Sequence, residues 1–363
     1  MSRSRLASIA RFAVCLLLLA VIFHVIFCNE VQLQLAATSG PQWSALDKWE
    51  QRRLAWTQGP AGVWETVRKL DAASLVVSFG SCGLLVALGG LRWREVLRAQ
   101  GIQLPLAPVL RISFVAHFFN AFLLGTAGGD VMKAWYVAKA APERGLEAAF
   151  SVFVDRLIGM LALLLFTVLL AVPNWELLAG YKRHLATALM IGGMFGVAGV
   201  MTFLGFFTDT LGPDGVVLRL IRRLPRGESF AQALGGCRQL ARHPGFLWRM
   251  AGWSLLVNIA IVGAFAALAQ GLGVKISPVA LWYLVPAIVS VAALPVTPAG
   301  LGVRENLFVW LLTVPALGVK PGAALSLSLL GYTVNLLWSV IGGVVYLATP
   351  GREQLKQPSA DTP

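Results

Sequence analysis

Charged residues are scarce in this chain. They make up 13% of the sequence while hydrophobic residues make up 57%, whereas a soluble globular domain carries about 25% charged residues. The mean hydropathy is correspondingly high, at +0.72. This composition excludes an ordinary soluble domain and predicts an integral membrane protein.

Residues that commonly carry catalytic chemistry are also few. The chain has four cysteines and four histidines, with no CxxC, HExxH or other metal-ligand spacing. No nucleophile elbow or Walker loop occurs, so the motifs indicate no catalytic residues, metal or cofactor, and leave enzyme activity uncertain. The net charge of +13 lies mainly between apolar runs, which indicates membrane orientation and not nucleic-acid binding.

Apolar runs long enough to cross a bilayer, which takes roughly 20 residues, recur along the chain. They cover about 9–28, 72–91, 157–173, 185–207, 247–272 and 322–348. Shorter apolar segments at 109–125, 278–294 and 305–317 are interrupted by glycine, proline or charge. We predict an all-α polytopic membrane protein with about six full spans and two re-entrant or broken-helix hairpins.

Basic residues gather in alternate connections, as cytoplasmic loops require. One cluster is Arg92, Arg94 and Arg98, which we assign to a cytoplasmic loop after the second span. Both termini are then cytoplasmic, in a bacterial inner membrane. The predicted organisation is a first transmembrane helix at 1–28, an external interfacial loop at 29–71, a transmembrane domain at 72–348 with a basic cytoplasmic loop at 208–246, and a cytoplasmic tail at 349–363.

The external loop is predicted to hold one short interfacial helix. Ser44 and Asp47 favour a helix start, and the helix is expected to cover about 45–57. The sequence Gly59-Pro60-Ala-Gly62 is then expected to end it.

Two glycine-rich interruptions are the most informative feature. The first reads Gly125-Thr-Ala-Gly-Gly-Asp130 and the second Pro298-Ala-Gly-Leu-Gly302-Val-Arg-Glu305. Broken backbone at membrane depth must be buried in protein or line a wet cavity, and paired broken segments in two halves indicate a transported-substrate site. The loop charges place the two hairpins in opposite orientation.

The charges beside the breaks suit a phosphate group. A helix restarting at Gly128-Gly129 would offer free backbone N–H groups to an anion, with Lys133 as the cation and Asp130 as a cap or partner of Lys133. Arg304 offers a planar guanidinium for bidentate phosphate contact. The alternative in both places is an ion pair or capped helix start that binds no ligand.

Asp155 and Arg156 open the span after the first break. Asp155 either stays at the cytoplasmic edge or turns inward to pair with Lys133 or Arg304. The candidate substrate-binding residues all lie at or near the breaks. They are Asn120, Gly128, Gly129, Asp130, Lys133, Asp155, Arg156, Pro298, Gly300, Gly302, Arg304 and Glu305.

These motifs resemble, in order, those of the lysylphosphatidylglycerol synthase transmembrane family. The resemblance covers about 75–348 and includes Asp155-Arg156-Leu-Ile-Gly159 between the two breaks. The family comprises the flippase half of aminoacyl-phosphatidylglycerol synthases and stand-alone membrane proteins, some linked to hopanoid or glycolipid pathways. The 29–71 loop is longer than the family pattern, and no stretch of this sequence resembles the aminoacyl-transferase domain, so synthase activity is not expected.

The expected function is that of a lipid translocase, a flippase or scramblase for a phosphate-bearing lipid or glycolipid. Lys133 and Arg304 would hold the phosphate together. The alternative is a membrane-embedded enzyme or accessory subunit of lipid modification, with Asp130 or Asp155 as base. The expected partners are membrane lipids, anionic or phosphate-bearing, and further candidates are a second copy of the chain or a lipid-biosynthesis protein.

Overall fold

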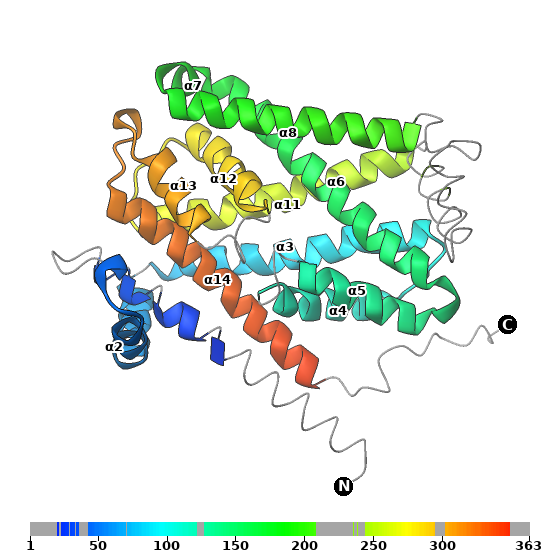
Figure 1. Ribbon diagram of the computed structural model, residues 1–363, viewed down its shortest axis with the longest axis horizontal. Helices are drawn as coiled ribbons and strands as arrows, with labels where there is room; N and C mark the ends of the chain where they lie inside the picture. The colour runs from blue at the N-terminus through cyan, green and yellow to red at the C-terminus, as the bar shows by residue number, and fades with distance from the viewer. Residues whose placement is uncertain are drawn as a thin grey trace, which may run out of the picture.

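The computed structural model describes residues 20–35 without 22, 29 and 33, residues 43–121 without 70, residues 127–207, residues 235 and 238, and residues 244–294 and 302–348. All elements in these residues are helices (Figure 1). We call residues 20–35 the N-terminal helix. Shorter or connecting helices are η1 (Trp43–Ala45), α2 (Lys48–Lys69), η3 (Pro142–Arg144), η4 (Val172–Asn174), α7 (Trp175–Gly180) and η7 (Pro315–Leu317).

Five helices of the described residues are long and apolar enough to span a membrane. They are α3 (Ala72–Ala99), α6 (Gly145–Ala171), α8 (Lys182–Phe207), α11 (Pro244–Gly271) and α14 (Pro321–Ala348). The all-α polytopic prediction is confirmed, and these helices match five of the six predicted spans. Most of the first predicted span, most of the 208–246 loop and the 349–363 tail lie outside the described residues.

Two pairs of short helices occupy the predicted hairpin positions. The first pair is α4 (Leu106–Asn120) and α5 (Ala127–Ala140), and the second is α12 (Pro278–Ala292) and α13 (Val303–Leu312). The members of each pair pack against each other. All four helices are shorter than the roughly 20 residues of a full span, so each pair enters the bundle without crossing it as two complete spans.

The two hairpins begin at opposite ends of α6. At the start of α6, Arg144 donates a hydrogen bond of 3.1 Å to the carbonyl of Gln100, which lies just before α4. Beyond the end of α6, Asn174 donates one of 3.1 Å to the carbonyl of Val279 at the start of α12. The helix pairs therefore have the opposite orientation that the loop charges predict.

The helix contacts also repeat between the two halves of the chain. The long helix after each hairpin packs against the first helix of the other hairpin, α6 on α12 and α14 on α4. Between them α3 and α11 run antiparallel, because Arg92 meets Ser254 while Ser81 lies beside Gly263. This exchange of contacts is the arrangement that an inverted repeat produces.

The prediction that Gly59 and Gly62 end a helix is wrong, because α2 continues through Pro60 to Lys69. These glycines instead face the N-terminal helix. A Cβ atom at Gly59 would lie 2.4 Å from the Cβ of Phe27, and one at Gly62 would lie 2.2 Å from the side-chain nitrogen Nε2 of Gln34. The missing side chains allow the two helices to approach closely.

The middle of α14 joins both hairpins to the N-terminal helix (Figure 1). Near the end of α4, Nε2 of His117 lies 3.3 Å from the carbonyl oxygen of Asn335. In the first turn of α13, the guanidinium carbon of Arg304 lies 4.1 Å from the centre of the Tyr332 ring. An apolar cluster at this level contains Ile26, Phe118, Tyr332 and Leu336. The two interrupted segments thus approach the same stretch of one long helix.

Candidate functional site

The helices of the first hairpin approach closely at the break. The backbone N–H of Gly129 donates a 2.8 Å hydrogen bond to Oδ1 of Asn120, and both Gly128 and Gly129 are buried. A Cβ atom at Gly129 would lie 2.2 Å from the carbonyl oxygen of Ala116. The Gly129 amide, expected to be free for an anion, therefore closes the hairpin instead.

Three buried charges form an ion triad beside this hairpin. Nε of Arg92 lies 2.8 Å from Oδ1 of Asp155, and Nζ of Lys133 lies 3.9 Å from Oδ2 of the same carboxylate. The side chains are 10%, 9% and 15% exposed for Arg92, Asp155 and Lys133. Two cations share one carboxylate, which leaves one positive charge in excess within the triad.

Neighbouring side chains hold the ion triad in place. Arg92 also donates from Nη1 to Oγ of Ser254 at 3.2 Å, and the absence of a side chain at Gly159 leaves room for its guanidinium, since a Cβ there would lie 2.7 Å from Nη2. The ammonium of Lys133 lies 4.8 Å from the Trp93 ring centre. Residues of α3, α5, α6 and α11 thus fix the positions of these charges.

Asp130 and Arg156 form a second ion pair, which we call the outer pair. Nε of Arg156 lies 2.7 Å from Oδ2 of Asp130, and the side chains are 45% and 25% exposed. The expected pairing of Asp130 with Lys133 is not among the ion pairs of the described residues. Successive residues of a helix point about 100° apart, so Asp155 faces the triad while Arg156 faces the more open edge.

The second break ends in a charged helix start. Gly302 has φ +80°, and its N–H donates a 2.6 Å hydrogen bond to Oε2 of Glu305. The other oxygen of this carboxylate accepts from Arg304, whose Nε lies 3.4 Å from Oγ of Ser328. Glu305 is therefore both cap and counter-ion, and Arg304 is packed over Tyr332. Pro298 and Gly300 lie outside the described residues.

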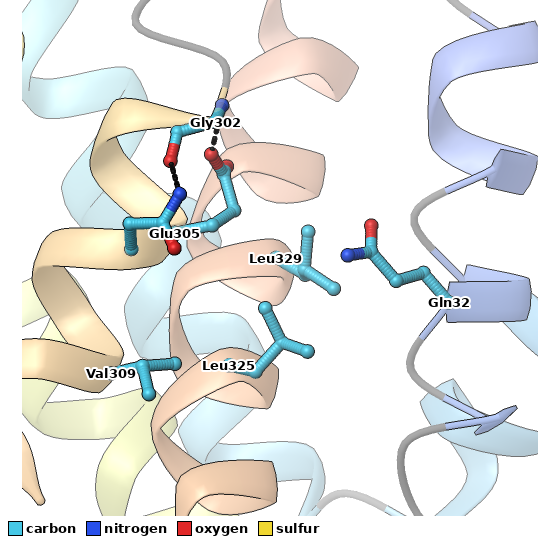
Figure 2. Close-up of a pocket in the computed structure, with 7 residues that line it drawn as sticks. Gln32, Gly302, Glu305, Val309, Leu325 and Leu329 are labelled. Atoms are coloured by element: carbon cyan, nitrogen blue, oxygen red, sulfur yellow. Dashed lines mark hydrogen bonds between the residues drawn. The ribbon is translucent and has the colours of Figure 1, made fainter. Parts of the chain in front are cut away.

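A cavity of about 400 Å³ adjoins the second break. Figure 2 shows it between the N-terminal helix on one side and α13 and α14 on the other. Its lining is polar at the start of α13 and apolar further along. The lining residues are Gln32, Gly302, Glu305, Asn306, Val309, Leu325 and Leu329.

The structure brings the predicted charges into three groups, which are the ion triad, the outer pair and the Arg304–Glu305 pair. Asp155 turns inward to Lys133, which was one of the two predicted positions, while the ion pair of Arg304 uses Glu305. Assigning Arg92 to a loop was wrong, because α3 continues to Ala99 and Arg92 is only 8% exposed. The sequence Leu91-Arg-Trp-Arg-Glu-Val96 contains no glycine or proline, and this was the feature of the sequence that indicated a continuing helix.

Comparisons with known proteins agree with this architecture. Residues 53–343 match the family described as the lysylphosphatidylglycerol synthase TM region. The chain is also 24% identical over 317 residues to a UPF0104 membrane protein of Methanothermobacter thermautotrophicus, covering 79% of this chain and 88% of that relative. The match spans both hairpins, the ion triad and the second break. The protein is therefore a multi-pass member of the lysylphosphatidylglycerol synthase transmembrane family.

Proposed function

We propose that this protein is a lipid translocase, a flippase or scramblase that moves a phosphate-bearing lipid or glycolipid across a bacterial cytoplasmic membrane. The ion triad is the observation that carries this proposal. Uncompensated charge inside a membrane protein is costly and marks substrate or ion pathways. A lipid phosphate would balance the excess cation through charge-assisted hydrogen bonds from Lys133 or Arg92.

The opposed hairpins supply the second part of the argument. One broken segment enters from each end of α6, and both reach the middle of α14. An inverted repeat of this kind can expose a central site alternately to the two sides of the membrane. The headgroup would pass between Lys133 and Arg304 while the lipid chains stay in the bilayer.

The ion pairs favour transport over the alternative of base catalysis. A general base must lie within hydrogen-bond reach of the substrate proton that it abstracts, and the carboxylate oxygens of Asp155 and Asp130 contact protein cations instead. Asp155 is held by Arg92 and Asp130 by Arg156. Both carboxylates that could serve an embedded enzyme are thus engaged with cations.

Lys133→Ala tests the phosphate contact. In liposomes containing a fluorescent phospholipid, the translocation rate should fall about 10- to 100-fold, since a hydrogen bond to a charged group contributes about 1.5–3 kcal/mol. Folding should persist because Arg92 still pairs with Asp155. The rate is measured from the fraction of lipid that dithionite quenches with time.

Lys139→Ala is the matched control, because Lys139 lies on the same helix but is exposed near Trp135. It should translocate lipid at the wild-type rate. If Lys133 and Arg304 contact one phosphate together, the double Ala variant should lose less than the two single effects combined. Normal translocation by a destabilised Lys133→Ala protein would mean that Lys133 only supports the fold.

The orientation can be tested with single cysteines in a cysteine-free background. Glu143 lies in η3 beside the first hairpin and Lys320 just before α14, and both are exposed. With cytoplasmic termini, a membrane-impermeant thiol reagent added to intact cells should label Lys320→Cys and not Glu143→Cys. Labelling of Glu143→Cys alone would reverse the proposed orientation.

A further inference from the structure

Three polar side chains line the cavity at the second break, one from the N-terminal helix and two from α13. Figure 2 shows the amide of Gln32 extending from the N-terminal helix across the cavity toward α14. The Glu305 carboxylate and the Asn306 amide line the same space from α13. Amides both donate and accept hydrogen bonds, and a carboxylate already holding one partner per oxygen retains further acceptor positions.

The charges at the polar lining of this cavity are balanced. Glu305 is ion-paired with Arg304, and the other polar linings, Gln32 and Asn306, are uncharged. A cationic headgroup would find no excess negative charge here, and an anionic one no excess positive charge. Neutral hydroxyl groups, which donate and accept at once, match these side chains best.

The rest of the cavity lining is apolar. Val309 of α13 and Leu325 and Leu329 of α14 line it. The volume of about 400 Å³ lies within the roughly 300–1,000 Å³ of small-molecule sites. It would hold a polyol or a sugar residue. The apolar lining would then lie beside the first carbons of the lipid's hydrocarbon chains.

The N-terminal helix brings Gln32 from outside the family match, which begins at residue 53. Two sets of contacts fix the position of the N-terminal helix. Close contacts at Gly59 and Gly62 hold it against α2, and Ile26 packs into the apolar cluster on α14. Gln32 is therefore held at the cavity by packing on both sides.

We propose that this cavity binds the hydroxyl-bearing headgroup of the translocated lipid, and that Gln32 sets the preference for hydroxyl groups. The inference rests on the proposed translocase function and names its substrate class. The phosphate is bound by the cations beside the breaks, while the amides of Gln32 and Asn306 read the group attached to that phosphate.

The test compares two lipids that differ only in headgroup hydroxyls, phosphatidylglycerol and phosphatidylpropanol, both fluorescently labelled. Reconstituted wild-type protein should translocate phosphatidylglycerol about tenfold faster. Gln32→Leu should reduce this ratio to near one by slowing phosphatidylglycerol alone. Asn306→Leu should act in the same direction. Lys133→Ala should slow both lipids equally, because both carry the phosphate.

Gln34→Leu is the matched control, since Gln34 lies on the same helix but faces Gly62 of α2. It should keep the wild-type ratio. Equal rates for both lipids in the wild type, or an unchanged ratio in folded Gln32→Leu and Asn306→Leu proteins, would overturn the inference and leave the translocase standing. Movement of neither lipid, nor of any sugar-headed lipid, would overturn the translocase itself. Binding of free inositol to the reconstituted protein, together with equal translocation of the two lipids, would indicate a soluble polyol as occupant and contradict the lipid assignment.

Discussion

Asp155→Asn should destabilise the protein by about 3–5 kcal/mol, the usual cost of removing one partner from a buried ion pair. The substitution keeps the shape of the side chain but leaves Arg92 and Lys133 as two buried cations without their shared carboxylate. The loss should appear as a lower melting temperature of the detergent-purified protein. It should also lower the amount of folded protein in the membrane.

Two further variants distinguish this cause from a general packing defect. Asp155→Asn combined with Lys133→Met should recover part of the stability, because one of the two unbalanced cations is gone. Asp130→Asn removes the carboxylate of the outer pair, where Arg156 is 45% exposed, and should cost much less. Equal losses for Asp155→Asn and Asp130→Asn would contradict the description of the triad as the buried charge centre.

Gly129→Ala should separate the two helices of the first hairpin. The added methyl group would lie 2.2 Å from the carbonyl oxygen of Ala116 and 2.7 Å from Oδ1 of Asn120. Backbone cannot yield as a flexible side chain would, so overpacking of about 1–3 kcal/mol adds to the loss of a hydrogen bond of about 1 kcal/mol. Thermal stability and lipid translocation should both fall.

Gly89→Ala on α3 provides the comparison, because a Cβ there meets no atom within 4 Å. Alanine is the better helix residue by about 1 kcal/mol, so this variant should be as stable as the wild type or more so. Wild-type stability of Gly129→Ala would show that α4 and α5 can move apart without cost. The close approach at Asn120 would then have no structural role.

The proposed function depends on the positions of the two breaks relative to α14. The first break lies near the ion triad, and the second adjoins the cavity that Gln32 completes. Both reach α14 within about one turn of each other, at Asn335 and Tyr332. In the proposed translocase, a lipid headgroup would exchange contacts with one helix while the two hairpins rearrange around it.

Local patterns in the sequence were sufficient for the membrane architecture. Hydropathy determines which segments leave water, so the five long helices of the described residues agree with the predicted spans. Glycine, proline and charge interrupt an apolar helix locally, so the predicted segments 109–125 and 278–294 lie close to the ends of α4 at Asn120 and of α12 at Ala292. Loop charges gave the opposite orientation of the two hairpins.

Local patterns failed where a residue acts through a distant neighbour. Glycines such as Gly59 and Gly62 are typical of a helix end. In the structure, however, they lie within an unbroken α2 and contact the N-terminal helix. Arg92 belongs to a basic cluster of the kind found in cytoplasmic loops, yet it lies buried in α3. Neither role is visible until the facing helix is in place.

The sequence by itself therefore determined that this is a helical membrane protein with two opposed breaks and charges beside them, because hydrophobicity and chain interruption act over a few neighbouring residues. Only the tertiary structure decided which charges meet. Arg92 reaches Asp155 across 63 residues and Ser254 across 162 residues of chain, and Gln32 joins a cavity formed by α13 and α14. Such contacts depend on the antiparallel packing of α3 with α11 and on the close approach of the N-terminal helix to α2, which no local pattern specifies.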